Sequence, residues 1–122
     1  MNTLNKQEIN DLKTKILENL DESKAKDVLA IDLDGKSDLC SYMIIASGTS
    51  DRHVMSIAEK LILELKQKNN EVPYSAEGVT EGKWALIDTS AIAVHVFHPE
   101  VREYYDLESL WYKPNSRNNL DN

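Results

Sequence analysis

The sequence EGVTEGKWALIDTSAIAVHVFHPEVREYY, which spans Glu77–Tyr105, decides how this chain folds. It contains two short apolar runs, Trp84–Asp88 and Ile92–Phe97, with only Thr89–Ala91 between them. Two runs of this length joined by so few residues predict an antiparallel β-hairpin. We therefore expect the rest of the chain to be organised around this hairpin.

The register of the hairpin follows if Ser90 and Ala91 form a two-residue turn. The opposed pairs are then Trp84–Phe97, Ala85–Val96, Leu86–His95, Ile87–Val94, Asp88–Ala93 and Thr89–Ile92. Because successive side chains of a strand point to opposite faces, this register divides the hairpin into two surfaces. One surface is small and aliphatic, and it consists of Ala85, Ile87, Val94 and Val96. The other consists of Trp84, Leu86, Asp88, His95 and Phe97.

The aliphatic surface is typical of a core that accepts a helix. The second surface combines two aromatic rings, a leucine, a carboxylate and an imidazole, which favours the centre of a protein interface. An aromatic pair in a strand is also common in cores, so the alternative is that a helix covers Trp84 and Phe97 and leaves Asp88 at the rim. The pattern alone leaves both interpretations open.

The first third of the chain predicts one helix and two strands. An amphipathic helix is expected after a cap at Thr3 or Asn5. Its apolar residues, at spacings of three and four, are Ile9, Leu12, Ile16 and Leu20. A strand is expected at Val28–Leu33, ended by an Asp-Gly turn at Gly35. A second strand at Tyr42–Ser47 is apolar on both faces and is therefore expected to be central in a sheet.

The remaining segments complete the predicted elements. Ser50 can cap a helix over Asp51–Lys68, whose apolar stripe should pack on the sheet. A short strand near Pro73–Glu77 is expected to return parallel to the central strand and close a right-handed crossover. Beyond the hairpin, Pro99 occupies a first-turn position of a short helix, and Asp106 can cap another.

These elements predict an α/β fold, with one domain that contains a mixed, roughly five-stranded sheet and flanking helices. The domain is expected to span residues 1–112. Residues 113–122 have almost nothing to bury, and we expect a flexible C-terminal tail there.

The composition limits the function. The 122 residues carry 21 acidic and 14 basic side chains, for a formal net charge of −7. Because nucleic-acid affinity comes from neutralising phosphates, we expect little direct nucleic-acid contact and, on a ribonucleoprotein, contact with a basic protein. Without an apolar run of about 18 residues or a secretory pattern, a cytoplasmic location away from membranes is expected. A single cysteine, Cys40, excludes an internal disulfide and a multi-thiolate metal site.

Three features admit an enzymatic interpretation. The turn Ser47–Ser50 joins a strand to a helix N-terminus, as in anion sites, although Asp51 already supplies a negative charge there. The segment Gly78–Lys83 departs from a phosphate-binding loop because it is one residue short and precedes a strand. His95 and Asp88 share a surface and could form a hydrogen-bonded couple, but no nucleophile is expected beside them. We therefore expect no catalytic residue, cofactor or metal.

Four groups of residues occur in a specific order and spacing over residues 9–112. They are Ser47–Val54 with Ile57-Ala58; Glu77-Gly78 with Gly82-x-Trp84-x-Leu86-x-Asp88; Val94–Phe97; and Arg102-x-Tyr104-Tyr105-x-Leu107-Glu108-x-Leu110-Trp111. Together they resemble the ribosomal silencing factor family, also called the Iojap family. Each group by itself is weak evidence for this family, whereas the four groups together are specific for it.

The resemblance implies a small α/β domain related to the nucleotidyltransferase fold. It also implies a translation repressor that binds the large ribosomal subunit through large-subunit ribosomal protein fourteen. Such a factor would sterically block joining of the small subunit and lower translation under starvation or in stationary phase.

The resemblance also maps the contact surface of the family onto this chain. The Trp-x-Leu-x-Asp strand of the family corresponds to Trp84, Leu86 and Asp88. The hairpin register predicts that this surface extends to Glu77, His95 and Phe97. Because apolar patches left open tend to self-associate, a homodimer of the free protein through Trp84 and Phe97 is a further expectation.

One position departs from the family pattern. Many members carry an Asp two residues before the Met-Ile-Ile run, where this chain has Ser41. A nucleotidyltransferase needs acidic residues at the edge of its sheet to hold Mg²⁺, so this departure weakens the enzymatic interpretation. The remaining alternative is a nucleotide-dependent transferase that uses Asp32, Asp34 and the turn Ser47–Ser50.

Overall fold

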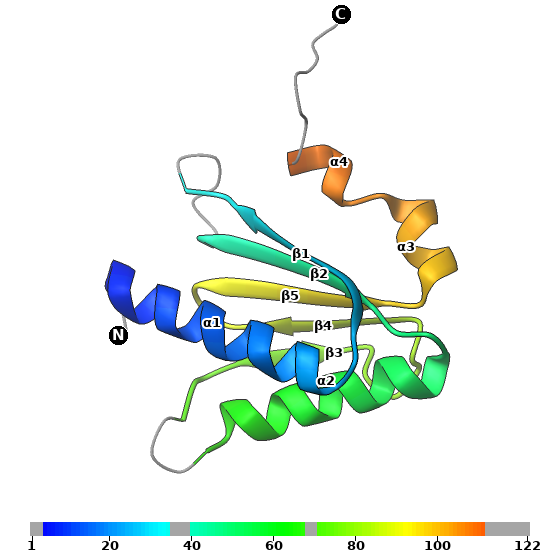
Figure 1. Ribbon diagram of the computed structural model, residues 1–122, viewed down its shortest axis with the longest axis horizontal. Helices are drawn as coiled ribbons and strands as arrows, with labels where there is room; N and C mark the ends of the chain where they lie inside the picture. Colours follow the sequence, from blue (N-terminus) through cyan, green and yellow to red (C-terminus); the bar gives the residue numbers. More distant parts are fainter. Residues whose placement is uncertain (1–3, 35–39, 68–70, 112–122) are drawn as a thin grey trace, which may run out of the picture.

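The computed structural model describes residues 4–34, 40–67 and 71–111 (Figure 1). The elements in chain order are α1 (Lys6–Glu22), β1 (Lys26–Asp32), β2 (Tyr42–Ser47), α2 (Asp51–Leu65), β3 (Ser75–Glu77), β4 (Trp84–Asp88), β5 (Ile92–Phe97), α3 (Pro99–Tyr105) and α4 (Glu108–Trp111). The predicted turn at Gly35 and the predicted tail at residues 113–122 lie outside the described residues.

The five strands form one sheet in the order β1-β2-β5-β4-β3. β2 and β5 are parallel, and the other neighbouring pairs are antiparallel. The prediction of an α/β domain with a mixed, roughly five-stranded sheet and flanking helices is therefore confirmed. Its relation to the nucleotidyltransferase fold stays a prediction.

The hairpin of β4 and β5 has the predicted register, with Trp84 opposite Phe97 at its open end. At the turn, the backbone N–H and the hydroxyl of Thr89 both donate to the carbonyl oxygen of Ile92, each at 2.9 Å. A shift by one residue would turn the buried Ile87 out of the core, which explains why the apolar pattern predicts the register.

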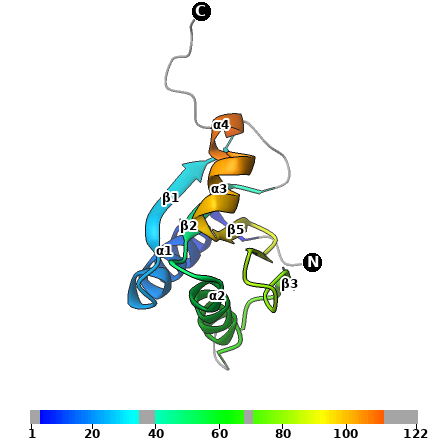
Figure 2. The same ribbon diagram turned by 90° about the vertical axis from the view of Figure 1, so that its right-hand side faces the viewer.

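The helices α1 and α2 lie on one side of the sheet and α3 on the other (Figure 2). Asn5, one of the two predicted candidates, caps α1 in a capping box with Glu8, and the Ser50 side chain caps α2 as predicted. The apolar sides of these two helices bury the predicted aliphatic surface of the hairpin. Side chains with no exposed area in this core include Ile16, Leu20, Ile57, Leu61, Ala85, Ile87, Val94 and Val96.

β3 runs in the same direction as β2, as predicted, but the two strands are not neighbours. β3 is antiparallel to β4, which is antiparallel to β5, and β5 is parallel to β2. The chain from β2 through α2 therefore crosses under β5 and β4 before it reaches the far edge. The hairpin of β4 and β5, which follows β3 in the sequence, occupies the positions between β2 and β3 in the sheet.

The loop between β3 and β4 requires both of its glycines. Gly78 and Gly82 each have φ near +74°, a conformation that side chains with a Cβ rarely adopt. A Cβ on Gly82 would also lie 2.5 Å from the carbonyl oxygen of Asp51 at the start of α2. Lys83 adds an ion pair to the carboxylate of Asp51 at 2.7 Å. The loop thus packs on α2 and fixes where Trp84 enters the sheet.

Candidate functional site

The predicted contact residues lie on the side of the sheet that faces away from α1 and α2. Three aligned rows of side chains cross β5 and β4 there. Trp84 is opposite Phe97, and Leu86 lies between His95 and Glu77. Asp88 is opposite Ala93 on one side and Ser75 on the other. One sheet surface therefore brings all six predicted residues together.

These six residues differ in how far they reach the surface. Glu77 and Asp88 are exposed, and Trp84 and Leu86 are partly exposed. We call these four residues the docking face. His95 retains only 8% of its surface and Phe97 none.

The prediction that Phe97 extends the exposed surface is wrong, and His95 reaches the surface only marginally. Both lie on β5, the middle strand of the sheet. Phe97 belongs to a second apolar cluster with Ile31, Leu33 and Ile45. Val101 of α3 and Leu107, just before α4, pack against the same cluster. Toward the edge of the sheet, β4 and β3 are less covered by other residues than β5 is.

The Trp84 indole packs against two aromatic rings. Its centroid lies 4.9 Å from that of Phe97 and 4.8 Å from that of Tyr105 at the end of α3. Its Nε1–H donates a hydrogen bond to Nδ1 of His95 at 3.0 Å. Rings at these separations attract one another beyond the area that they bury. The indole is therefore anchored on its inner side while part of it remains at the surface.

Tyr105 is the residue of this site that sequence reasoning missed. In the sequence Tyr105 belongs to the Arg102-x-Tyr104-Tyr105 motif after Pro99, and nothing there pairs it with a residue of the hairpin. The available signal was its position eight residues after Phe97, in a helix that begins at Pro99 beside the end of β5. Tyr104 and Tyr105 are both exposed, and their rings pack edge to face at 5.0 Å.

Asp88 is an exposed carboxylate at the end of β4. Partial burial raises the pKa of this carboxyl above its ordinary value. It lies near Cys40, whose thiol pKa is raised by burial first and by the Asp88 charge second. Because the thiolate is the reactive form of cysteine, Cys40 is a poor nucleophile at neutral pH. Among the described side chains, no hydrogen bond joins Asp88 to His95, and the proposed couple does not form.

Burial lowers the pKa of His95 from 6.5 to about 4. The unfolded chain takes up this proton near pH 6.5, so it binds more protons than the folded chain between pH 6.5 and about 4. The free energy of unfolding should therefore fall as the pH drops through this window, by roughly 2 kcal/mol between about pH 7 and pH 5 from His95 alone.

Urea unfolding at the two pH values measures this loss in the wild-type protein and in His95→Asn, which lacks the titrating ring. The variant should lose roughly 2 kcal/mol less on acidification than the wild type, since the other titrating groups are common to both. Equal losses in the two proteins would show that His95 does not carry the effect.

The alternative transferase site is not assembled in the structure. Asp32 is opposite Tyr42 at the start of β2, whereas Ser47 ends that strand, so about 17 Å of strand separates them. Asp32 and Asp34 instead line a pocket of about 210 Å³ with Lys6. Within the described ranges, no group of three or more His, Cys, Asp or Glu side chains is placed to hold a metal ion.

The turn Ser47–Ser50 is occupied by internal hydrogen bonds. The Thr49 N–H donates to Nδ1 of His53 at 2.9 Å, and the Ser50 hydroxyl accepts from the His53 N–H at 3.1 Å. The Asp51 carboxylate and Lys83 then form their ion pair at the same helix start. These contacts satisfy the donors that a phosphate would otherwise use.

Comparison with known proteins gives a consistent result. The family model described as "Ribosomal silencing factor during starvation" matches residues 6–122. The chain belongs to the ribosomal silencing factor family. Curated members include the silencing factors of Zymomonas mobilis, with 40% identity over 79% of this chain and 71% of that protein, and of Bacillus subtilis, with 38% identity over 75% and 76%. The resemblance seen in the sequence motifs is thus confirmed.

Solved structures similar to this silencing factor have the same fold. A crystal structure of a Chromobacterium violaceum protein has a TM-score of 0.81 at 36% identity and covers 88% of this chain and 90% of its own. A Bacillus halodurans structure has a TM-score of 0.73 at 33% identity and covers 84% and 94%. A mouse relative, named "Mitochondrial assembly of ribosomal large subunit protein 1", is 33% identical over 75% of this chain and 41% of that protein.

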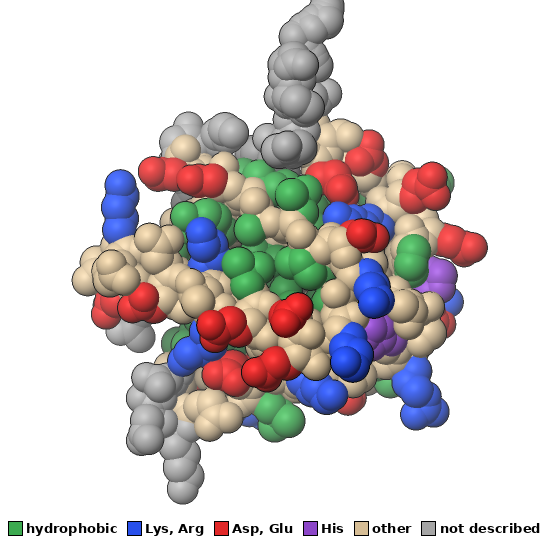
Figure 3. Space-filling view, in the orientation of Figure 1, with side chains coloured by type: hydrophobic (Ala, Val, Ile, Leu, Met, Phe, Trp, Pro, Cys, Tyr) green, Lys and Arg blue, Asp and Glu red, His purple; other side chains and the backbone are tan. Residues whose placement is uncertain are grey.

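Charged side chains of both signs surround the face that Figure 3 shows. On the side that carries α1, acidic and basic side chains alternate around an apolar centre, and neither sign forms a broad continuous area (Figure 3). Among the helices that the structure describes, none combines the length and apolar character needed to cross a membrane.

Proposed function

We propose that this silencing factor represses translation by docking its Trp84, Leu86, Asp88 and Glu77 face on the large ribosomal subunit, at large-subunit ribosomal protein fourteen. Bound there in the cytoplasm, it would sterically block the small subunit and lower translation under starvation or in stationary phase. The observation that carries the proposal is a partly exposed indole and leucine beside two exposed carboxylates on one sheet surface.

The chemistry of the docking face fits a basic protein partner. Trp84 and Leu86 supply apolar area of the kind that dominates binding energy at interface centres. Asp88 and Glu77 can pair with lysine or arginine side chains around that centre. The net charge of −7 disfavours ribosomal RNA as the main contact, because phosphates would be repelled.

The relatives support the choice of the large subunit. The matching family model describes a ribosomal silencing factor, and the printed name of the mouse relative refers to the ribosomal large subunit. A docked domain of this kind needs no catalytic residue or cofactor, since its bulk alone would exclude the small subunit.

A subunit-joining assay tests the proposed function. Purified small and large subunits are mixed with excess protein, and whole ribosomes are separated on a density gradient. The wild type should lower the whole-ribosome fraction, whereas Asp88→Lys should not, because a lysine would face a basic partner. Glu59→Lys is the matched control, since it makes the same charge change at an exposed position of α2. Inhibition by Asp88→Lys equal to that of the wild type would contradict the proposal.

We also propose that the free protein forms a homodimer through the docking face. The partly exposed Trp84 and Leu86 would cover one another in a two-fold arrangement. Phe97 cannot contribute directly, because it is fully buried. Sedimentation at about 100 μM should show a dimer, and a monomer at that concentration would reject it.

A further inference from the structure

The Trp84 indole has its only polar atom turned into the protein. Its Nε1–H is bonded to Nδ1 of His95 at 3.0 Å. The imidazole is itself confined, because it retains 8% of its surface and lies nearly parallel to the Phe97 ring, with an interplanar angle of 10°. A buried ring stacked on a buried ring is a rigid acceptor for the indole.

The direction of this hydrogen bond fixes the state of the imidazole. An indole N–H can only donate, so Nδ1 of His95 must carry a lone pair and no proton. The neutral ring then holds its proton on Nε2. A protonated imidazole would present an N–H to the indole N–H, and the contact would be lost.

We propose that His95 is a positioning residue, which locks the Trp84 indole so that the docking face presents ring carbons and no hydrogen-bond donor. This inference rests on the proposed docking of that face on a large-subunit protein. A partner that meets the exposed part of the indole would find only ring carbons and their hydrogens. Such a surface accepts aliphatic side chains and offers no N–H donor to a phosphate or carbonyl oxygen.

Locking the indole should also strengthen binding. A tryptophan that is free to change rotamer loses that freedom when a partner covers it, and this loss lowers affinity. Here the contacts with Phe97 and Tyr105 restrict the tilt of the indole ring. The hydrogen bond to His95 selects one orientation of that ring about its bond to Cβ. We expect removal of the acceptor to lower the affinity for large subunits about tenfold.

Two substitutions at position 95 separate the acceptor from simple packing. His95→Leu fills much of the same volume without an acceptor. His95→Asn places a side-chain oxygen near the position of Nδ1, and it should restore the hydrogen bond. The indole N–H of Trp84 is followed in ¹H–¹⁵N spectra, and the second indole signal is assigned with Trp111→Phe.

In His95→Leu, we expect the Trp84 indole N–H to exchange with water at least tenfold faster and the affinity for large subunits to fall about tenfold. His95→Asn should retain both wild-type values. An unchanged exchange rate in folded His95→Leu would overturn the positioning role, whether or not the protein binds ribosomes. If the wild type itself did not bind large subunits, the proposed function would be rejected instead. If the Trp84 indole N–H exchanged faster in His95→Leu while binding stayed unchanged, the contribution of His95 to docking would be overturned.

Discussion

Replacing Trp84 with alanine should lower the affinity for large ribosomal subunits at least a hundredfold, or about 2.8 kcal/mol. The indole is the largest partly exposed side chain of the docking face, and its inner side is already ordered by Phe97, Tyr105 and His95. Little conformational freedom is therefore left to lose on binding, and most of the apolar contact should appear as affinity. Tryptophan is also among the residues most enriched at interface hot spots.

The affinity can be measured by co-sedimentation of the labelled protein with large subunits over a range of subunit concentrations. Leu63→Ala is a suitable control, because Leu63 is a 64% exposed leucine of α2, on the opposite side of the sheet. It should bind like the wild type. Circular dichroism should confirm that Trp84→Ala remains folded. Equal affinities of folded Trp84→Ala and the wild type would remove the central residue of the proposed interface.

The hairpin shows what the sequence predicts well. Its register depends on a two-residue turn and on the alternation of small apolar and mixed side chains, both of which are local. The four small aliphatic residues of the hairpin must be buried in the core. Their alignment therefore also fixes which side chains lie on the opposite surface of the hairpin. These four residues are Ala85, Ile87, Val94 and Val96. The Ser50 cap is equally local and was predictable for the same reason, whereas the sequence left Thr3 and Asn5 as alternative caps of α1.

Properties that depend on distant packing were not predictable in this way. Phe97 and Trp84 are opposite one another in the register, yet one is fully buried and the other partly exposed. The difference arises because β5 lies in the middle of the sheet beneath residues of α3, whereas β4 lies nearer the edge. Strand order and the path of a seven-residue helix leave no periodic signal in the hairpin itself.

The transferase alternative failed for a related reason. Asp32 and Ser47 are each at the end of a strand, and the sequence does not show that these ends are opposite ones. Because β1 and β2 are antiparallel, Asp32 is level with the start of β2. The acidic residues and the turn thus lie apart, and only the strand pairing shows it.

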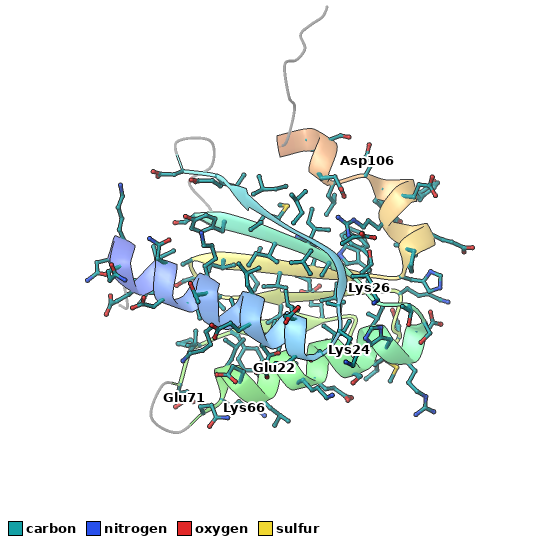
Figure 4. All side chains as sticks on the ribbon, in the orientation of Figure 1. Glu22, Lys24, Lys26, Lys66, Glu71 and Asp106 are labelled. Atoms are coloured by element: carbon teal, nitrogen blue, oxygen red, sulfur yellow. The ribbon has the colours of Figure 1, made fainter. Side chains whose placement is uncertain are left out.

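Arg102 is the second position where a large effect is expected. Its guanidinium contacts the carbonyl oxygen of Asp27 at 2.7 Å, the Ser47 hydroxyl at 3.0 Å and both carboxylate oxygens of Glu108 at 3.2 Å. Only 13% of this side chain is exposed. One residue therefore ties α3 and α4 to β1 and β2. Asp106, labelled in Figure 4, joins the two helices in a left-handed conformation with φ of 48°.

Arg102→Ala should lower the free energy of unfolding by about 3 kcal/mol, because it leaves the Glu108 carboxylate partly buried without its cation. Urea unfolding measures this change. Arg52→Ala, at an exposed arginine in the first turn of α2, should change it by less than about 0.5 kcal/mol. Arg102→Lys should not restore stability fully, since an ammonium group cannot form the two parallel bonds to Glu108.

Arg102→Ala should also affect the docking face. Tyr105 is the last residue of α3, and its ring packs on Trp84, so we expect this contact to depend on the position of that helix. Loosening α3 would remove the Tyr105 contact from the indole without breaking the hydrogen bond to His95. We therefore expect Arg102→Ala to weaken binding to large subunits less than Trp84→Ala does. Tight binding by a folded Arg102→Ala protein would show that Tyr105 does not support the indole during docking.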